Sequence, residues 1–154
     1  MKVIDQHLLD RLSAEAAANP RLRKNRNFHP ADDARCHRLL NAIEPGSYIR
    51  PHRHLDPAKD EAFVILRGRL AVFIFDEDGA VGETAVLSPG GANVAADVPH
   101  GIFHTAVALE SGTVFFEAKA GPYLPVSEEE KAPWAPEEGT PQAEAYLALL
   151  TARV

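Results

Sequence analysis

The chain of 154 residues has a single cysteine, Cys36, and no long apolar run. One cysteine excludes an internal disulfide and fits a reducing compartment, so we expect a cytoplasmic protein. The longest apolar segments, residues 62–66 and 70–75, are separated by Arg67 and Arg69 and are much shorter than a membrane-spanning helix. The N-terminus also lacks the apolar region of a signal peptide. We therefore expect no membrane association.

An excess of positive charge is also absent. The chain has 16 Lys and Arg against 22 Asp and Glu, which gives a net charge of −6 with histidine neutral. Nucleic acids and anionic membranes attract basic proteins, so we expect neither as a partner. The length suits one domain with its own core, and we predict a single domain over residues 1–154.

Short apolar segments separated by turn residues fill the centre of the chain. Strong turn signals include DEDG at 76–79 and SPGG at 88–91. Short strands at this spacing, with no helix between them, predict an all-β sandwich or barrel within residues 36–119. The expected strands are 37–44, 48–54, 62–66, 69–75, 82–87, 93–98, 104–109 and 113–118.

Helices are expected only at the two ends of the chain. Apolar residues at helical spacing predict an N-terminal helix within residues 1–20, with Asp5 as its N-cap. The final part, residues 120–154, is rich in proline and glutamate and predicts a strap across the outside of the barrel or across a neighbouring subunit. We expect the strap to end in a helix from Pro141 to Leu150, capped by Thr140.

Residues 21–30, RLRKNRNFHP, are a basic and polar run inside an acidic protein. The simpler interpretation is a solvated loop that leads into the first strand. The functional interpretation is an anion-binding edge, because arginine, lysine and amide side chains bind phosphate or carboxylate groups.

Three histidines and a glutamate form a candidate metal site. His52 and His54 are two residues apart, so both would point to the same face of a strand. Glu61 opens the next apolar segment, and His104 follows as a fourth candidate. Imidazole and carboxylate ligands suit Fe, Mn, Ni, Zn or Cu better than Mg or Ca. We expect one divalent transition metal (Fe, Mn, Ni or Zn).

The spacing of these residues resembles the two sequence motifs of the cupin superfamily. The first motif is G-x5-H-x-H-x3/4-E-x6-G. It is matched by Gly46, His52, His54, Glu61 and Gly68, except that six residues instead of three or four separate His54 from Glu61. The central part of the second motif, P-x-G-x2-H, is matched by Pro99, Gly101 and His104. The N-terminal helix, the RLRKNRNFH run and PGSYIRPHRH more specifically resemble the WbuC family of cupin-fold metalloproteins.

This resemblance implies a cupin fold, a jelly-roll barrel also called a double-stranded β-helix. It also implies a metal held by His52, His54, Glu61 and His104, with Asp60 or Asp56 in place of Glu61 if the preceding loop shifts. The WbuC family is associated with gene neighbourhoods for O-antigen type polysaccharides, without an established reaction. Fold analogy further implies a homodimer.

Other candidate residues follow from their position near the metal motif. The catalytic candidates are Arg50, which shares the face of the histidine pair in a regular strand, and His100. The substrate-binding candidates are Arg26, His29, Arg50 and Tyr48, and an apolar lining is expected from Tyr48, Phe63, Phe73, Phe103 and Phe115.

Three functions are compatible with these residues. The first is a metal-dependent enzyme, of isomerase, epimerase or dioxygenase type, that acts on a small polar, anionic or sugar-derived molecule. The second is a non-catalytic metal- or sugar-binding or sensing module. The third is a metal-free enzyme resembling the sugar-nucleotide epimerases of the cupin superfamily, which the four converging candidate ligands argue against.

Overall fold

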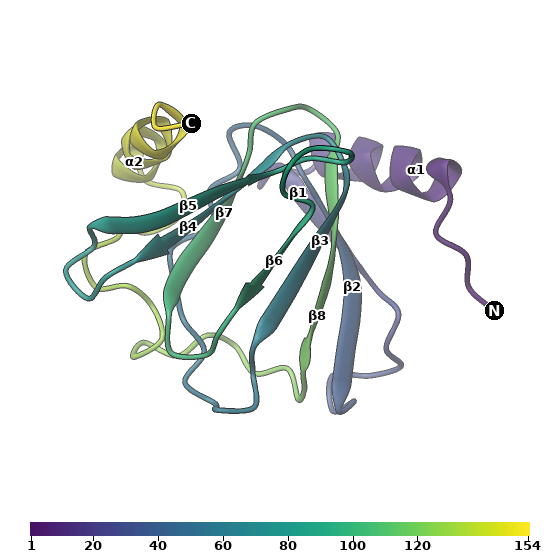
Figure 1. Ribbon diagram of the computed structural model, residues 1–154, viewed down its shortest axis with the longest axis horizontal. Coiled ribbons are helices and arrows are strands. Elements are labelled where there is room, and N and C mark those ends of the chain that lie inside the picture. The colour runs from purple at the N-terminus through teal and green to yellow at the C-terminus, as the bar shows by residue number, and fades with distance from the viewer.

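A computed structural model describes residues 1–154 and shows two β-sheets that face each other, with one helix near each end of the chain (Figure 1). No helix is both long and apolar enough to span a bilayer. In chain order the elements are α1 (Gln6–Ala17), β1 (Arg23–Asn27), β2 (Cys36–Ile43), β3 (Glu61–Arg67), β4 (Leu70–Phe75), β5 (Val81–Leu87), β6 (Ala95–Val98), β7 (Phe103–Ala108), β8 (Thr113–Ala120) and α2 (Pro141–Thr151).

The two sheets have the strand orders β1-β2-β8-β3-β6 and β5-β4-β7, and every pairing is antiparallel. Neighbouring strands are often far apart in the sequence, as β2, β8 and β3 show, which is the pattern of a jelly roll rather than of a meander. The predicted all-β cupin fold is therefore confirmed.

Strand β4 shows why the apolar residues of the smaller sheet do not alternate with polar ones. Leu70 and Val72 point into the core between the two sheets, whereas Ala71, Phe73 and Phe75 point to the outer face. Both sets are buried, because the C-terminal segment covers the outer face. A strand buried on both sides needs a continuous apolar sequence.

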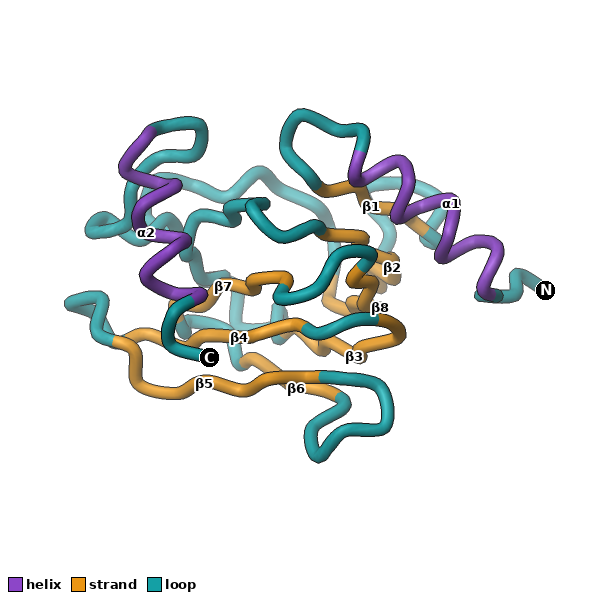
Figure 2. Tube along the Cα trace, turned by 90° about the horizontal axis from the view of Figure 1, so that it is seen from above, coloured by secondary structure: helices purple, strands orange, loops and turns teal.

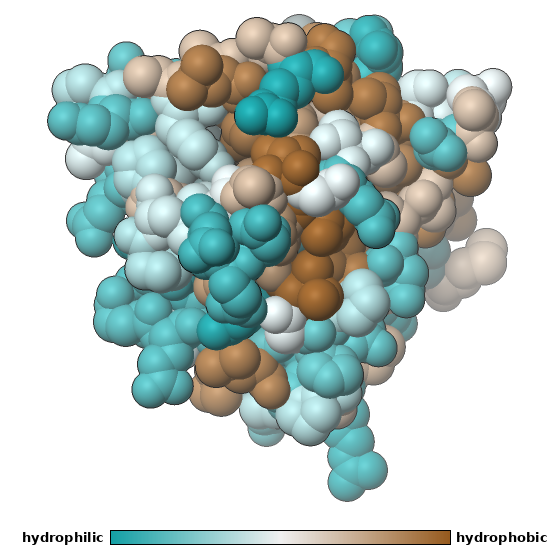
Figure 3. All heavy atoms as spheres, turned by 60° about the vertical axis from the view of Figure 1, so that its left-hand side comes forward, coloured by the Kyte–Doolittle hydropathy of each residue, from teal (hydrophilic) through white to brown (hydrophobic).

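The C-terminal strap and α2 form this cover, as predicted. The Trp134 ring lies 5.0 Å from the Phe75 ring and 5.9 Å from the Phe103 ring, measured between centroids. Thr140 caps α2 by accepting a hydrogen bond of 3.2 Å from the backbone N–H of Ala143. The view in Figure 3 brings this side of the molecule forward and shows apolar atoms gathered in a band between hydrophilic margins.

Helix α1 lies on the opposite side of the molecule from α2 (Figure 2). Asp5 caps it, as predicted, with a 2.9 Å hydrogen bond from the backbone N–H of Leu8 to its carboxylate. The apolar face of α1 packs on the outer face of the larger sheet through a cluster of Leu8, Leu9, Leu12, Ala16, Leu40, Ala42 and Val114.

Two segments differ from the sequence prediction. Within the run 21–30, residues Arg23–Asn27 form the edge strand β1 instead of a loop. A polar edge strand carries no apolar alternation, so its pairing with β2 is invisible in the sequence. Residues 48–54 were expected to form a strand, but only His52 makes β-bridges there, to His104 and Lys131. Pro51 has no N–H to donate to a regular ladder.

A substitution of Gly68, the last glycine of the first cupin-like motif, tests the turn between β3 and β4. Gly68 has φ +74°, and a Cβ atom there would lie 2.8 Å from the Thr113 Cα. We expect Gly68→Ala to lower the free energy of unfolding by about 3 kcal/mol, from backbone strain and the clash together. Gly90→Ala is the control, since its φ is +71° with no atom within 4 Å, and it should cost about 1 kcal/mol. Equal losses in urea denaturation would contradict the clash.

Candidate metal centre

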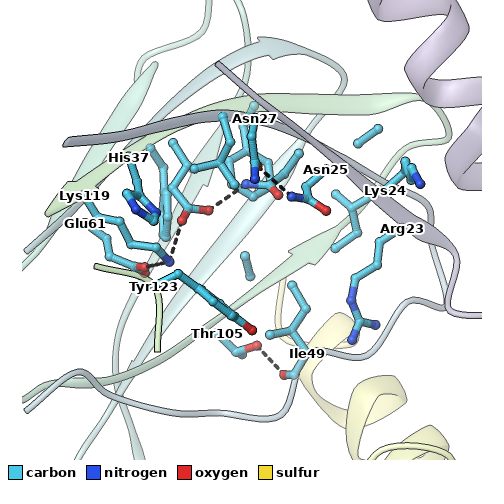
Figure 4. Close-up of a pocket in the computed structure, with 18 of the residues that line it drawn as sticks. Arg23, Lys24, Asn25, Asn27, His37, Ile49, Glu61, Thr105, Lys119 and Tyr123 are labelled. Carbon is cyan, nitrogen blue, oxygen red and sulfur yellow. Dashed lines mark hydrogen bonds and ion pairs between the residues drawn. The ribbon is translucent and has the colours of Figure 1, made fainter. Parts of the chain in front are cut away.

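A cavity of about 640 Å³ lies between the two sheets (Figure 4). Its inner end is lined by His52, Glu61 and His104, and its rim is formed by residues of β1 and the segment before it. Only 8 of its 24 lining residues are hydrophobic, so the cavity offers a ligand many polar groups beside its apolar surface.

Three candidate ligands meet at the inner end, where one donor atom from each of His52, His54 and Glu61 lies within 4.8 Å of the others. His52 is fixed by two backbone hydrogen bonds exchanged with His104, of 3.0 and 2.9 Å. Glu61 is the first residue of β3 and is buried, as is His54. These three residues can therefore hold a metal ion.

His104, the fourth candidate, joins the same cluster through Glu61. Its Nε2 lies 3.0 Å from Glu61 Oε2, while His54 Nε2 lies 2.9 Å from Glu61 Oε1. Lys119 contacts the same carboxylate. Burial opposes ionisation of Glu61, but the hydrogen bonds from His104 and His54 and the charge of Lys119 hold its pKa well below the ordinary value. Glu61 is therefore a carboxylate, the form that a metal requires.

The orientation of the imidazoles also fits a metal. Nδ1 of His52 lies 3.0 Å from the Arg50 carbonyl, and Nδ1 of His104 lies 2.9 Å from the Ile102 carbonyl. A carbonyl only accepts, so each Nδ1 carries the hydrogen and Nε2 is left with a lone pair when the ring is neutral. Burial, with a further contribution from His104, lowers the pKa of His52 to about 3, which keeps this ring neutral.

The hydrogen-bond partners of His104 also indicate a place for a cation. Its Nδ1 faces a carbonyl and its Nε2 faces the carboxylate of Glu61, so both ring nitrogens face acceptors. Either a second proton or a cation must lie between Nε2 and Glu61. Imidazole and carboxylate donors in this arrangement suit a divalent transition metal bound by His52, His54, Glu61 and His104.

The charged residues of β8 were missed in the sequence. Strand pairing places Lys119 opposite Glu61 of β3 and opposite His37 of β2. Lys119 Nζ lies 2.7 Å from Glu117 Oε1, and Asn41 donates a 2.6 Å hydrogen bond to the other oxygen of Glu117. The signal was present in the alternation of Phe115, Glu117 and Lys119 along an otherwise apolar strand, since these side chains share the face that lines the cavity.

Burial and charge have opposite effects on the pKa values of Glu117 and Lys119. Burial raises the pKa of Glu117, and Lys119 only partly offsets the effect. Burial alone would lower the pKa of Lys119, but the charges of Glu117 and Glu61 outweigh it and raise the pKa. Lys119 therefore stays a cation between two buried acids.

Four of the five predicted catalytic and substrate-binding residues do not line the cavity. Arg50 points to the strap, where it donates a 3.0 Å hydrogen bond to the Ala132 carbonyl. The Tyr48 hydroxyl donates to the Pro136 carbonyl at 2.9 Å. The expectation for Arg50 relied on regular strand alternation through residues 48–54, which the bridge at His52 does not provide. Arg26 lies in a separate depression beside α1, because alternation along β1 turns it away from Asn25 and Asn27.

His100 is the fourth of these residues. Its Nδ1 lies 2.8 Å from the Asp60 carboxylate at the surface, and its side chain is 43% exposed. This pairing also occupies Asp60, while Asp56 accepts a hydrogen bond from the Ala58 backbone. Neither aspartate replaces Glu61 in the cluster.

His29 does line the cavity, and its ring stacks on that of His37 with 3.9 Å between centroids. Two of the five residues expected to form an apolar lining do so. Phe63 and Phe115 face the cavity, whereas Tyr48, Phe73 and Phe103 lie in the core beneath the strap.

Comparisons with known proteins identify a family and a fold. A family model described as "Domain of unknown function (DUF6016)" matches residues 4–87. No curated protein matches the sequence.

Three solved structures resemble the chain. KdgF from Halomonas sp. is 22% identical, with 70% of this chain and 85% of that chain covered and a TM-score of 0.53. TT1209 from Thermus thermophilus is 26% identical, with coverage of 78% and 97% and a TM-score of 0.54. SPY1581 from Streptococcus pyogenes, described as a protein of unknown function, is 20% identical, with coverage of 80% and 90% and a TM-score of 0.54. These likenesses concern the fold.

Replacing Lys119 tests the charge balance of the cavity. Lys119→Met leaves Glu61 and Glu117 buried without their shared cation, so we expect a loss of about 3 kcal/mol in the free energy of unfolding at pH 7. Lys24→Met, at the exposed rim of the same cavity, is the control and should change stability by less than about 0.5 kcal/mol.

The loss in Lys119→Met should also depend on pH. A carboxyl group whose pKa is raised by folding stabilises the folded state when protonated, and this contribution is lost as pH rises through the folded pKa. Folding raises the pKa of Glu117 above its ordinary value of 4.5. The stability deficit of Lys119→Met should therefore shrink as pH falls from 7 toward this raised pKa. A deficit that is constant between pH 7 and 5 in urea denaturation would contradict this account.

Proposed function

The chain belongs to a family described as a domain of unknown function (DUF6016), and from the chemistry of its cavity we propose that it is a metal-dependent enzyme acting on a small anionic or sugar-derived molecule. The observation that carries the proposal is the convergence of His52, His54 and Glu61, with His104 beside them, at the inner end of a polar cavity. Four protein ligands leave one or two positions open on a five- or six-coordinate metal, and a metal next to a cavity can accept a substrate there.

When bound, the metal would supply Lewis-acid polarisation of a carbonyl or hydroxyl group and a template for substrate oxygens. The protein residues would supply proton transfer and the contacts to the substrate. Glu117 lies in the cavity wall two residue pairs along from Glu61, where it can accept or donate a proton. Lys119 fixes the position of both carboxylates. Asn25, Asn27 and Asn41 offer amide donors and acceptors that suit hydroxyl groups.

The charge at the cavity rim supports an anionic substrate. Arg23 is held by Glu138 at 2.8 Å and by a 2.9 Å hydrogen bond to the Tyr48 carbonyl, so it is rigid. Lys24 lines the same rim and makes no ion pair. An anion that enters the cavity therefore meets a fixed and a free cation before it reaches the metal site.

We also propose a role in O-antigen type polysaccharide biosynthesis in the cytoplasm. The resemblance of RLRKNRNFH and PGSYIRPHRH to the WbuC family supports the first part, and the single cysteine supports the second. Six residues of RLRKNRNFH line the cavity, which links this resemblance to the site: Arg21, Arg23, Lys24, Asn25, Asn27 and His29.

Elemental analysis tests whether the protein binds a metal. We expect purified protein to carry one Fe, Mn, Ni or Zn per chain, and His52→Ala to lose it, because the substitution removes one of the three converging donors. Lys24→Met, at the rim of the cavity, should retain the metal. Protein that binds no metal even after reconstitution would contradict the proposal and favour the metal-free epimerase-like alternative.

Exchange of substrate hydrogen with solvent deuterium tests whether the protein is an enzyme. Metal-loaded protein is incubated in D₂O with uronic acids and sugar phosphates, and deuterium incorporation beside the carbonyl carbon is followed by NMR. We expect exchange by the wild type and none by His52→Ala; where the metal is iron, oxygen consumption is the corresponding measurement. Saturable binding of these compounds without exchange or oxygen consumption would instead indicate a binding module.

We further propose a homodimer that forms through the part of the larger sheet that α1 leaves uncovered. Helix α1 packs on β1, β2 and β8. On β3, Val64 is 40% exposed and pairs with the half-buried Phe116. We expect Val64→Asp to weaken the dimer in sedimentation velocity, while Leu149→Asp on exposed α2 leaves it unchanged. A wild-type monomer at all concentrations would exclude the dimer.

A further inference from the structure

The C-terminal strap contacts the metal-binding segment as well as the core. The backbone N–H of Arg53 donates to the Glu130 carbonyl at 2.9 Å, and the N–H of Ala132 donates to the Pro51 carbonyl at 3.0 Å. His52 is the bridge partner of Lys131 in the strap and of His104 in β7. The two candidate histidine ligands are therefore carried by a segment held between a strand and the strap.

Glu130 reaches behind His54 from the strap. Its Oε1 accepts a 3.0 Å hydrogen bond from the Leu55 N–H, and its Oε2 accepts a 2.9 Å hydrogen bond from the Ser127 N–H. Both oxygens are thus held by backbone groups, and the carboxylate is rigid. Its Oε1 lies 4.0 Å from His54 Nδ1.

His54 is the one candidate histidine whose Nδ1 does not face a carbonyl. Nδ1 of His52 and of His104 faces a backbone oxygen. In His54 the carboxylate of Glu130 takes that place, on the side of the ring opposite to Glu61. All three rings therefore direct Nδ1 toward an oxygen outside the cluster.

We propose that Glu130 is a positioning residue of the metal centre: its carboxylate favours the hydrogen of His54 on Nδ1 and so keeps Nε2 available to the metal. This role rests on the proposed metal site. At 4.0 Å the carboxylate acts through its charge, since the distance exceeds that of a hydrogen bond. Carboxylates that accept a hydrogen bond from a metal-bound histidine strengthen metal binding, and Glu130 would supply the electrostatic part of that effect.

The test compares Glu130→Gln with Glu129→Gln. Glutamine at 130 keeps an oxygen for the Leu55 N–H but removes the charge. Glu129 is exposed and makes no hydrogen bond or ion pair, so its substitution removes the same charge one residue away. The affinity for Zn²⁺ is measured by competition with a chromophoric chelator. We expect about a 10-fold weaker affinity for Glu130→Gln, at the low end of the range for such residues, and no change for Glu129→Gln.

A second readout separates positioning from a general structural role. In the zinc-loaded wild type, NMR of the imidazole nitrogens should show the His54 hydrogen on Nδ1 in slow exchange with water. In Glu130→Gln this hydrogen should exchange faster, while those of His52 and His104 remain unchanged. Because this signal is specific to one ring, a variant that is merely less stable does not reproduce it.

The outcomes distinguish this inference from the proposed function. Wild-type protein without zinc affinity would defeat both. Wild-type affinity in Glu130→Gln, or an equal loss in Glu129→Gln, would overturn the role of Glu130 and leave the metal centre intact. If Glu130→Gln does not fold, Glu130→Ala also removes the charge and replaces it in the same two measurements; an unchanged His54 signal and full zinc affinity in Glu130→Ala would overturn the role as well.

Discussion

The buried charge of Glu61 is the constraint on which the rest of the site depends. A carboxylate that is 3% exposed is costly unless neighbouring groups neutralise it. His54, His104 and Lys119 all contact it, and they come from a loop, from β7 and from β8. One charge therefore ties together both sheets and the loop between β2 and β3. With Glu117 included, the two acids outnumber the one lysine, and this excess negative charge favours a bound cation.

Local patterns in the sequence predicted the parts of the site that are close together in the chain. The spacing of His52, His54 and Glu61, together with the match around His104, located the candidate ligands, and turn residues located most strands. The error at Arg50 came from assuming regular alternation in a segment that contains Pro51 and makes only one pair of bridges. Alternation is informative only where a strand is paired along its length.

The residues that sequence reasoning missed are fixed by contacts between distant segments. Lys119 reaches Glu61 because β8 pairs with β3, and Glu130 reaches His54 because the strap returns across the barrel. Neither contact leaves a local pattern beyond isolated charged residues. Strand β1 was missed for a related reason, since its identity as a strand depends on pairing with β2 and not on its own polar sequence.

The position of the strap has a consequence for biosynthesis. Translation proceeds from the N-terminus, so His52, His54 and Glu61 are made before the groups that neutralise and orient them. A nascent chain that ends before His104 has three donors but lacks β8, which places Lys119 opposite Glu61, and the carboxylate behind His54. The candidate metal centre is therefore completed late, by segments that leave the ribosome after its first three donors.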